Sequence, residues 1–120
     1  MTVNTKRVYD PPARTDGYRV LIDRLWPRGL SKERAAIAEW ARDLAPSDEL
    51  RRWFDHRPER FAEFERRYTE ELRAHAERIS ALRRRGRSGT VTIVYAARDS
   101  EHSNAAVLAP IVRRGFPRRG

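Results

Sequence analysis

Residues 16–29 bring together the side chains of this chain that are best suited to binding or catalysis. The apolar run 20–22 is typical of a buried strand, and it leads directly into charged and hydrogen-bonding side chains: Asp23, Arg24, Trp26 and Arg28. Pro27 and Gly29 then end any regular element. Because ligands of open α/β sheets bind at the carboxyl ends of the strands, this cluster predicts a binding site there.

A second polar cluster follows the other clear strand, which we expect over residues 90–95. Its members are Arg98, Asp99, Ser100, Glu101, His102 and Asn104. In a parallel sheet the two clusters lie at one edge. Asp23 and Asp99 are therefore the candidate catalytic residues, each orienting the ligand or acting as a base. His102 is a candidate general base because histidine titrates near neutral pH, although a histidine in the first turn of a helix is more often a surface residue.

Arginine points to an anionic ligand, because its planar guanidinium pairs with phosphate or carboxylate through two hydrogen bonds. We expect Arg24, Arg28 and Arg7 to hold the anion, and backbone N–H groups at helices beginning near Ser47 and Ser100 add to such a site. The candidate ligand-binding residues are Arg7, Arg24, Trp26, Arg28, Ser47, Arg51, Ser100 and Asn104. No cofactor is predicted, and the sequence contains no metal-binding pattern, phosphate loop or dinucleotide fingerprint.

Each of these residues also has a structural interpretation. Asp23 and Arg24 then pair with other charges, Trp26 is a packing anchor, and Ser47 and Ser100 only cap helices. The two acidic residues that directly follow Ser47 oppose an anion at that helix terminus. The sequence leaves both interpretations open.

The predicted elements alternate between strands and helices. We expect strands over residues 6–9, 18–25 and 90–95, and helices over residues 31–36, 47–54, 58–72, 76–85 and 100–112. Residues 37–44 fit a helix or a strand, and a strand is favoured because the sheet otherwise has too few members. This order predicts a small single-domain α/β three-layer sandwich, with a largely parallel sheet flanked by helices. The domain spans residues 1–114, and residues 115–120 form a frayed basic tail.

Composition narrows the class of protein. A chain of 120 residues builds one domain with one modest core. The lack of cysteine excludes disulfides and thiol chemistry and fits the cytoplasm. No apolar run reaches the roughly 20 residues that span a bilayer, and the N-terminus lacks the apolar region of a secretory signal. We therefore expect a cytoplasmic protein without a membrane partner, and the oligomeric state is not predicted.

The net charge of +9 raises nucleic acid as an alternative partner. Most of the excess lies in residues 83–87 and 113–119, and the strong preference for arginine over lysine also fits a bias in genome composition. The alternatives are therefore a small-molecule enzyme or binding protein, a nucleic-acid-binding module with weak non-specific affinity, and a protein-interaction domain without a ligand. A concave pocket lined by Arg24 and Arg28 favours the first, whereas a flat basic face joining the two arginine-rich segments favours the second.

Segment 23–29 has the pattern Asp-Arg-x-Trp-Pro-Arg-Gly, and with residues 6–10 and 16–19 it resembles the YeaO-like branch of a bacterial domain-of-unknown-function family. The resemblance extends over roughly residues 5–113. It implies a small cytoplasmic α/β domain without an established biochemical role, and it supplies no catalytic assignment. The matching residues are Arg7, Asp23, Arg24, Trp26, Pro27, Arg28, Gly29, Pro46, Ser47, Arg51 and Asn104. The arginine-rich segments and residues 116–120 depart from the family pattern.

Overall fold

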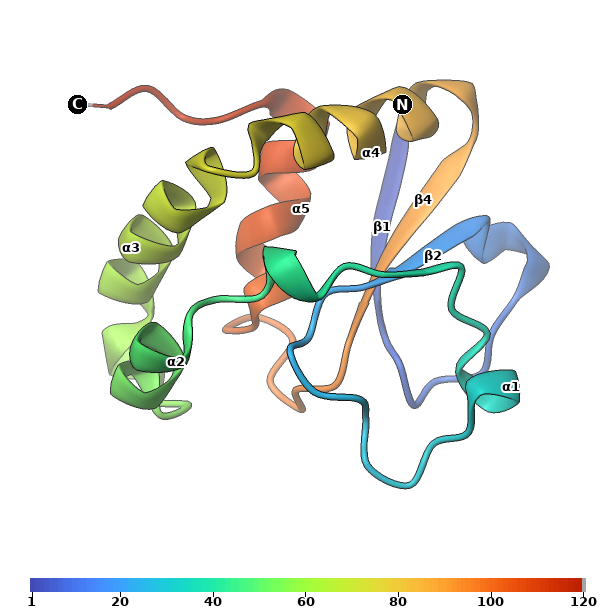
Figure 1. The fold of residues 1–120 in the computed structure, drawn as a ribbon, viewed down its shortest axis with the longest axis horizontal. Coiled ribbons are helices and arrows are strands. Elements are labelled where there is room, and N and C mark those ends of the chain that lie inside the picture. The colour runs from blue at the N-terminus through green and yellow to red at the C-terminus, as the bar shows by residue number, and fades with distance from the viewer. Residues whose placement is uncertain (120) are drawn as a thin grey trace.

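A computed structural model describes residues 1–119 and contains one four-stranded parallel sheet. The spatial order is β1-β4-β2-β3, where β1 is Thr2–Arg7, β2 is Tyr18–Leu21, β3 is Glu39–Trp40 and β4 is Thr90–Tyr95. Every neighbouring pair is parallel, so the carboxyl ends of β2 and β4 lie at the same edge of the sheet (Figure 1). The predicted α/β fold with a parallel sheet is confirmed.

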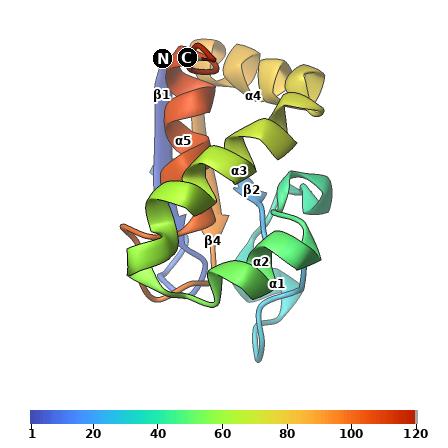
Figure 2. The same cartoon turned by 90° about the vertical axis from the view of Figure 1, so that its left-hand side faces the viewer.

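The longer helices gather on one face of the sheet. They are α3 (Phe61–Arg73), α4 (Ala76–Ser88) and α5 (Asn104–Arg114), and α2 (Asp48–Phe54) packs beside α3. Helices α4 and α5 contact β1 and β4 directly, whereas α3 lies outside α5 (Figures 1 and 2). Among residues 1–119, the opposite face is covered by the short α1 (Lys32–Ala35) and the loops around it.

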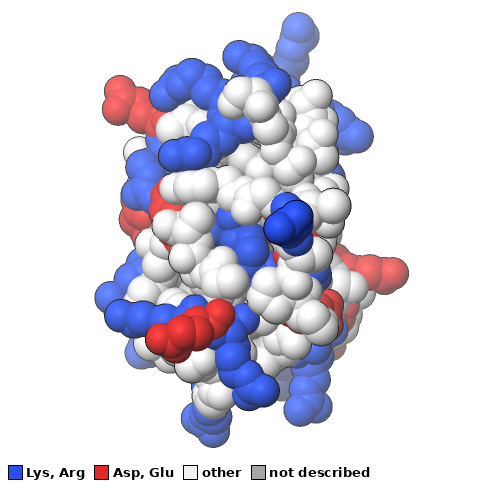
Figure 3. Space-filling model, turned by 90° about the vertical axis from the view of Figure 1, so that its right-hand side faces the viewer, with Lys and Arg blue, Asp and Glu red and all other residues white. Residues whose placement is uncertain are grey.

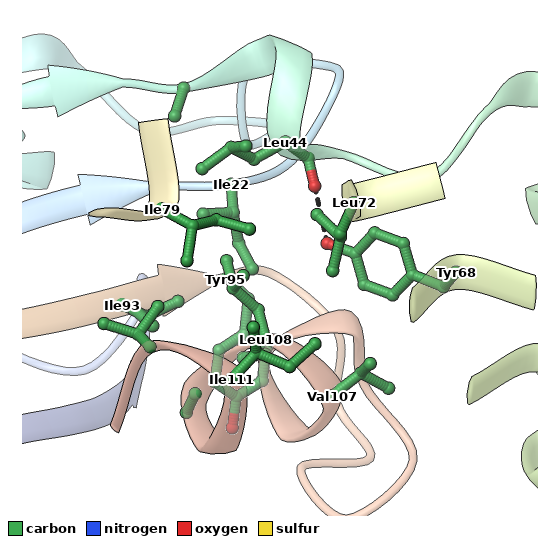
Figure 4. Packing of buried hydrophobic residues seen from close by; sticks show 14 of the residues in the cluster. Ile22, Leu44, Tyr68, Leu72, Ile79, Ile93, Tyr95, Val107, Leu108 and Ile111 are labelled. Carbon is green, nitrogen blue, oxygen red and sulfur yellow. Dashed lines mark hydrogen bonds between the residues drawn. The ribbon is translucent and has the colours of Figure 1, made fainter. Parts of the chain in front are cut away.

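Alternating side chains of the strands fill the two layers, as the period of a strand requires. Val20, Ile22 and Ile93 point into the main core between the sheet and helices α3–α5, whereas Leu21 and Val94 belong to the smaller cluster on the other face. Figure 4 shows how the main core is closed beside α3. There the hydroxyl of the fully buried Tyr68 donates a hydrogen bond of 2.5 Å to the carbonyl oxygen of Leu44.

The structure corrects the predicted bounds of the strands. The first strand covers Thr2–Arg7 instead of residues 6–9, because the polar residues at its start pair with β4 along its whole length. The second ends at Leu21 instead of residue 25, although the Ile22 amide still donates to Val94. Residues 37–44 contribute the two-residue β3 and a turn of 3-10 helix over Arg42–Leu44, so the choice of a strand is confirmed for residues 39–40 only.

Two predicted helix ends are also wrong. Helix α4 continues through Gly86 to Ser88, because the hydrogen side chain of Gly86 lets the helix lie against Met1 and Val3. Helix α5 is capped by Ser103 instead of Ser100, since the Ser103 hydroxyl accepts the Ala106 N–H at 3.2 Å. Residues 101–102 form a turn before that helix, with a bend on either side at residues 100 and 103.

The arginine-rich residues 115–119 have no helix or strand, but they contact α3. The Arg73 guanidinium lies 5.0 Å from the centre of the Phe116 ring and donates to the Pro117 carbonyl at 2.6 Å. Arg119 pairs with Glu70 at 3.1 Å. Gly120, the last residue of the predicted frayed tail, lies outside the described residues. Within residues 1–119, no helix combines the length and the apolar character that crossing a membrane demands.

Candidate functional site

A cleft of about 610 Å³ opens at the carboxyl edge of β2 and β4. The segment after β2, the segment after β4 and the residues around α2 form its walls. Apolar groups make up much of its surface, among them Leu25, Pro46, Phe54, Phe64 and Ala97. The cleft therefore lies where the two polar clusters of the sequence were expected to meet.

Four exposed arginines line this cleft: Arg24, Arg28, Arg51 and Arg98. Arg24 Nε and Arg51 Nη2 both approach the same carboxylate oxygen of Asp48, at 3.2 and 3.3 Å. Within residues 1–119, the guanidinium groups of Arg28 and Arg98 have neither a hydrogen bond nor an ion pair. Part of the positive charge is thus compensated by the protein, and two guanidinium groups remain for a ligand.

Asp23 lines the cleft, and both of its carboxylate oxygens are engaged. Oδ2 accepts the Ala96 N–H at 2.8 Å, and Oδ1 accepts the side-chain amide of Asn104 at 3.1 Å. The Asn104 amide also donates to the Ile22 carbonyl at 3.2 Å. Burial raises the pKa of Asp23, and the hydrogen bonds from Asn104 and Ala96 oppose that rise. These contacts tie the ends of β2 and β4 to the start of α5.

Two tryptophans hold the segment that follows Asp23. Trp40 Nε1 donates to the Asp23 carbonyl at 2.7 Å, and Trp26 Nε1 donates to the Leu30 carbonyl at 2.6 Å. The two rings meet edge to face with their centres 5.3 Å apart. Trp26 therefore packs in the smaller core cluster and also borders the cleft, so the packing interpretation of this residue accounts for most of its contacts.

His102 and Asp99 form a hydrogen-bonded pair on the cleft wall. Nδ1 of His102 lies 2.7 Å from Oδ2 of Asp99, and Oδ1 accepts the backbone N–H groups of Glu101 and His102. The hydrogen bond from His102 is the main cause that lowers the pKa of Asp99. The imidazole ring also stands edge-on to Phe61, with ring centres 5.1 Å apart.

Three residues that the sequence assigned to the site do not line the cleft. Arg7 donates to the carbonyl oxygens of Ala97 and Ala96 at 3.0 and 3.2 Å, so it supports the cleft wall from behind. Ser47 donates to Glu71 from its hydroxyl at 2.6 Å and from its backbone N–H at 2.8 Å. Ser100 is exposed in the turn before α5.

The other predicted residues Asp23, Arg24, Trp26, Arg28, Arg51, Asp99 and Asn104 all line the cleft. That they bind a ligand or take part in catalysis stays a prediction.

Sequence reasoning left several lining residues out of the candidate site. Arg98 lies three residues after the end of β4; the sequence placed it in the second polar cluster but not among the candidate ligand-binding residues. Phe54 and His56 come from the end of α2, where Asp55 and His56 have φ values of 51° and 52°. No local pattern places them at the sheet edge, because their position depends on how α2 packs against α3.

The arginine-rich segments lie elsewhere on the molecule. The two segments approach each other where the Arg83 side chain lies beside Gly115. A Cβ atom at position 115 would be 3.5 Å from Nη1 of Arg83. Several of their cations have partners within the protein: Arg113 donates to the Val3 carbonyl, and Arg85 lies 3.7 Å from the centre of the Tyr18 ring. On the face shown in Figure 3, basic side chains lie at separate places with acidic ones among them.

Comparison with known proteins finds one family and several uncharacterised relatives. The family described as "Inactive DUF488-N3 subclade" matches residues 2–119. An uncharacterised protein of Mycobacterium tuberculosis is 46% identical over 110 residues, which cover 92% of each chain. The uncharacterised protein YeaO of Escherichia coli is 39% identical over 113 residues, which cover 94% of this chain and 98% of the relative. No solved structure matches this chain.

Proposed function

This chain belongs to the inactive DUF488-N3 subclade, and within that family we propose that it binds a small phosphorylated or carboxylated molecule in the cleft at the carboxyl edge of β2 and β4. The observation that carries the proposal is the set of arginines around a largely apolar cleft, two of which have no partner within residues 1–119. Such guanidinium groups form charge-assisted hydrogen bonds with anions, often two at a time. The apolar walls suit the uncharged remainder of the ligand.

Binding is favoured over catalysis at Asp23. A general base needs a carboxylate oxygen that reaches the substrate proton, whereas both oxygens of Asp23 already accept hydrogen bonds from the protein. The description of the family as inactive agrees with a role in binding. In this proposal Asp23 shapes the cleft and Arg28 and Arg98 supply the affinity.

A thermal-shift screen identifies the ligand class, with phosphate, nucleotides, sugar phosphates, carboxylates and short oligonucleotides as probes. Calorimetry with the best small anion then tests Arg28. Hydrogen bonds to charged groups contribute about 1.5–3 kcal/mol each, so Arg28→Ala weakens binding roughly 10- to 100-fold. Arg28→Lys recovers little of the loss, because an ammonium group does not reproduce the planar fork.

Arg84→Ala is the matched control, because Arg84 is an exposed arginine of α4 that does not line the cleft. Equal affinity of the parent, Arg28→Ala and Arg84→Ala would show that segment 23–29 is a packing motif and refute the proposal. The rival function, nucleic-acid binding by the arginine-rich segments that meet at Arg83 and Gly115, gives a different pattern. Oligonucleotides then bind, their affinity falls steeply with salt, and Arg28→Ala leaves it unchanged.

A further inference from the structure

His102 presents one ring nitrogen that no protein group uses within residues 1–119. Its Nδ1 is engaged by Asp99 at 2.7 Å, and its ring is held edge-on by Phe61. Nε2 is then the only polar atom of this side chain left for a ligand, and His102 lines the same cleft as Arg28 and Arg98. Once the imidazole is protonated, His102 therefore adds a donor to the guanidinium groups of Arg28 and Arg98.

We infer that the ligand carries a doubly charged oxyanion head group of the phosphate monoester type, and that protonated His102 donates to it through Nε2 beside Arg28 and Arg98. This inference rests on the proposed function. A phosphate monoester has three terminal oxygens, which match three donors, whereas a carboxylate offers two oxygens and one charge. His102 is therefore the residue that selects a dianion over a monoanion.

Asp99 is the positioning residue for His102. Because an ionised carboxylate only accepts hydrogen bonds, Nδ1 of His102 donates to Asp99, and this contact orients the ring. Because the His102 hydrogen bond lowers the pKa of Asp99, this carboxylate keeps its charge at neutral pH and stabilises an imidazolium. Phe61 of α3 adds an aromatic edge without a charge.

Other titratable and charged groups border the same cleft. They are Tyr9, Asp23, Arg24, Arg28, Arg51, His56 and Arg98. Arg24 and Arg51 share Asp48, and Asp23 is engaged by Ala96 and Asn104. Histidine is the side chain that ordinarily changes charge between mildly acidic and mildly basic pH, so His102 and His56 are the two groups whose protonation the experiment must separate.

The test uses sulfate and methyl sulfate as probes, measured by calorimetry from about pH 8.5 to about pH 5.5. Sulfate stays a dianion and methyl sulfate a monoanion over this range, so any pH dependence comes from the protein. We expect sulfate to gain about tenfold in affinity on acidification, since it acquires one hydrogen bond from a charged donor. Methyl sulfate binds more weakly and gains less.

His102→Gln abolishes the gain of sulfate on acidification. Asp99→Asn keeps the ring but removes the carboxylate that accepts the hydrogen bond from Nδ1, so the gain becomes smaller. His75→Gln is the matched control, because His75 also has an aspartate neighbour, Asp43 at 3.9 Å, but lies outside the cleft. This control keeps the full gain.

Three results would overturn the inference while the proposed function survives. The first is sulfate binding that does not depend on pH. The second is a pH dependence that His56→Gln removes and His102→Gln retains. The third is equal affinity for sulfate and methyl sulfate, or binding of carboxylates alone. By contrast, failure of every anion to bind, or binding of the best anion that Arg28→Ala leaves unchanged, would refute the proposed function itself.

Discussion

Asp23→Asn replaces one carboxylate oxygen by an NH₂ group without changing the shape of the side chain. In the parent protein the two oxygens accept hydrogen bonds from the Ala96 N–H at 2.8 Å and from the Asn104 amide at 3.1 Å. An asparagine side chain has only one acceptor oxygen. One of these two donors therefore faces another donor, at the point where β2, β4 and α5 are joined.

The change in the free energy of unfolding caused by Asp23→Asn follows from the lost acceptor oxygen and depends on pH. A largely buried donor without a partner costs about 1–3 kcal/mol. The parent protein has an opposing cost, because burial raises the pKa of Asp23 above its ordinary value of 3.8. The folded state then binds a proton more readily than the unfolded state, so the contribution of Asp23 to stability falls as the pH rises above 3.8 through the folded-state pKa. Asparagine does not titrate and lacks this cost.

Urea denaturation of both proteins at several pH values measures the difference. We expect the loss of the second acceptor to cost the variant at most about 1–3 kcal/mol, and the stability of the parent relative to the variant to fall as the pH rises from acidic to neutral. Other carboxyls with lowered pKa values, among them Asp16 and Asp99, lose stability as the pH falls, but they are present in both proteins and cancel in the difference. A difference that is constant with pH, or that shrinks on acidification, would refute this account of Asp23.

Two further stability predictions concern the frame that carries the cleft. Tyr68→Phe costs about 1–2 kcal/mol in urea denaturation, because it leaves the Leu44 carbonyl without its donor in the core; an unchanged midpoint would contradict that. Gly17→Ala and Gly29→Ala both place a side chain at positive φ, which costs about 1–2 kcal/mol, but only at Gly17 does the new Cβ meet backbone, 2.4 Å from the Thr90 carbonyl oxygen. We expect Gly17→Ala to lose about 1–3 kcal/mol more than Gly29→Ala, and equal losses would be inconsistent with the close approach of η1 (Arg14–Asp16) and β4.

The sequence predicted those parts of the fold that depend on local apolar patterns. The apolar runs 20–22 and 91–95 became neighbouring parallel strands, so the two polar clusters that follow them meet at one edge. The start of β1 escaped prediction because its residues are mostly polar, and an edge strand needs only one buried face. The cap of α5 was misplaced because Ser100 and Ser103 are equally good caps by type, and the turns built on Asp99 decide between them.

The spacing of residues in the sequence did not show which candidate side chains already form hydrogen bonds within the protein. Arg7 is used by Ala96 and Ala97, about ninety positions away in the chain, and Ser47 by Glu71, 24 positions away. A sequence pattern identifies a residue as capable of binding an anion, but only the tertiary structure shows whether that capacity is already used. The same limit applies to His56, which reaches the cleft through the packing of α2 against α3.

In the motif at residues 23–29, some side chains have a structural role and others have the proposed binding role. Asp23 and Trp26 are tied into the protein by hydrogen bonds, and Pro27 is buried. Arg24 directly follows Asp23, Arg28 directly follows Pro27, and both arginines are exposed at the cleft. The backbone that carries the two arginines is thus ordered before any ligand arrives, so binding has to immobilise only their side chains. Since ordering loops and side chains is a main cost of association, such a frame makes even an exposed arginine an effective contact for an anion.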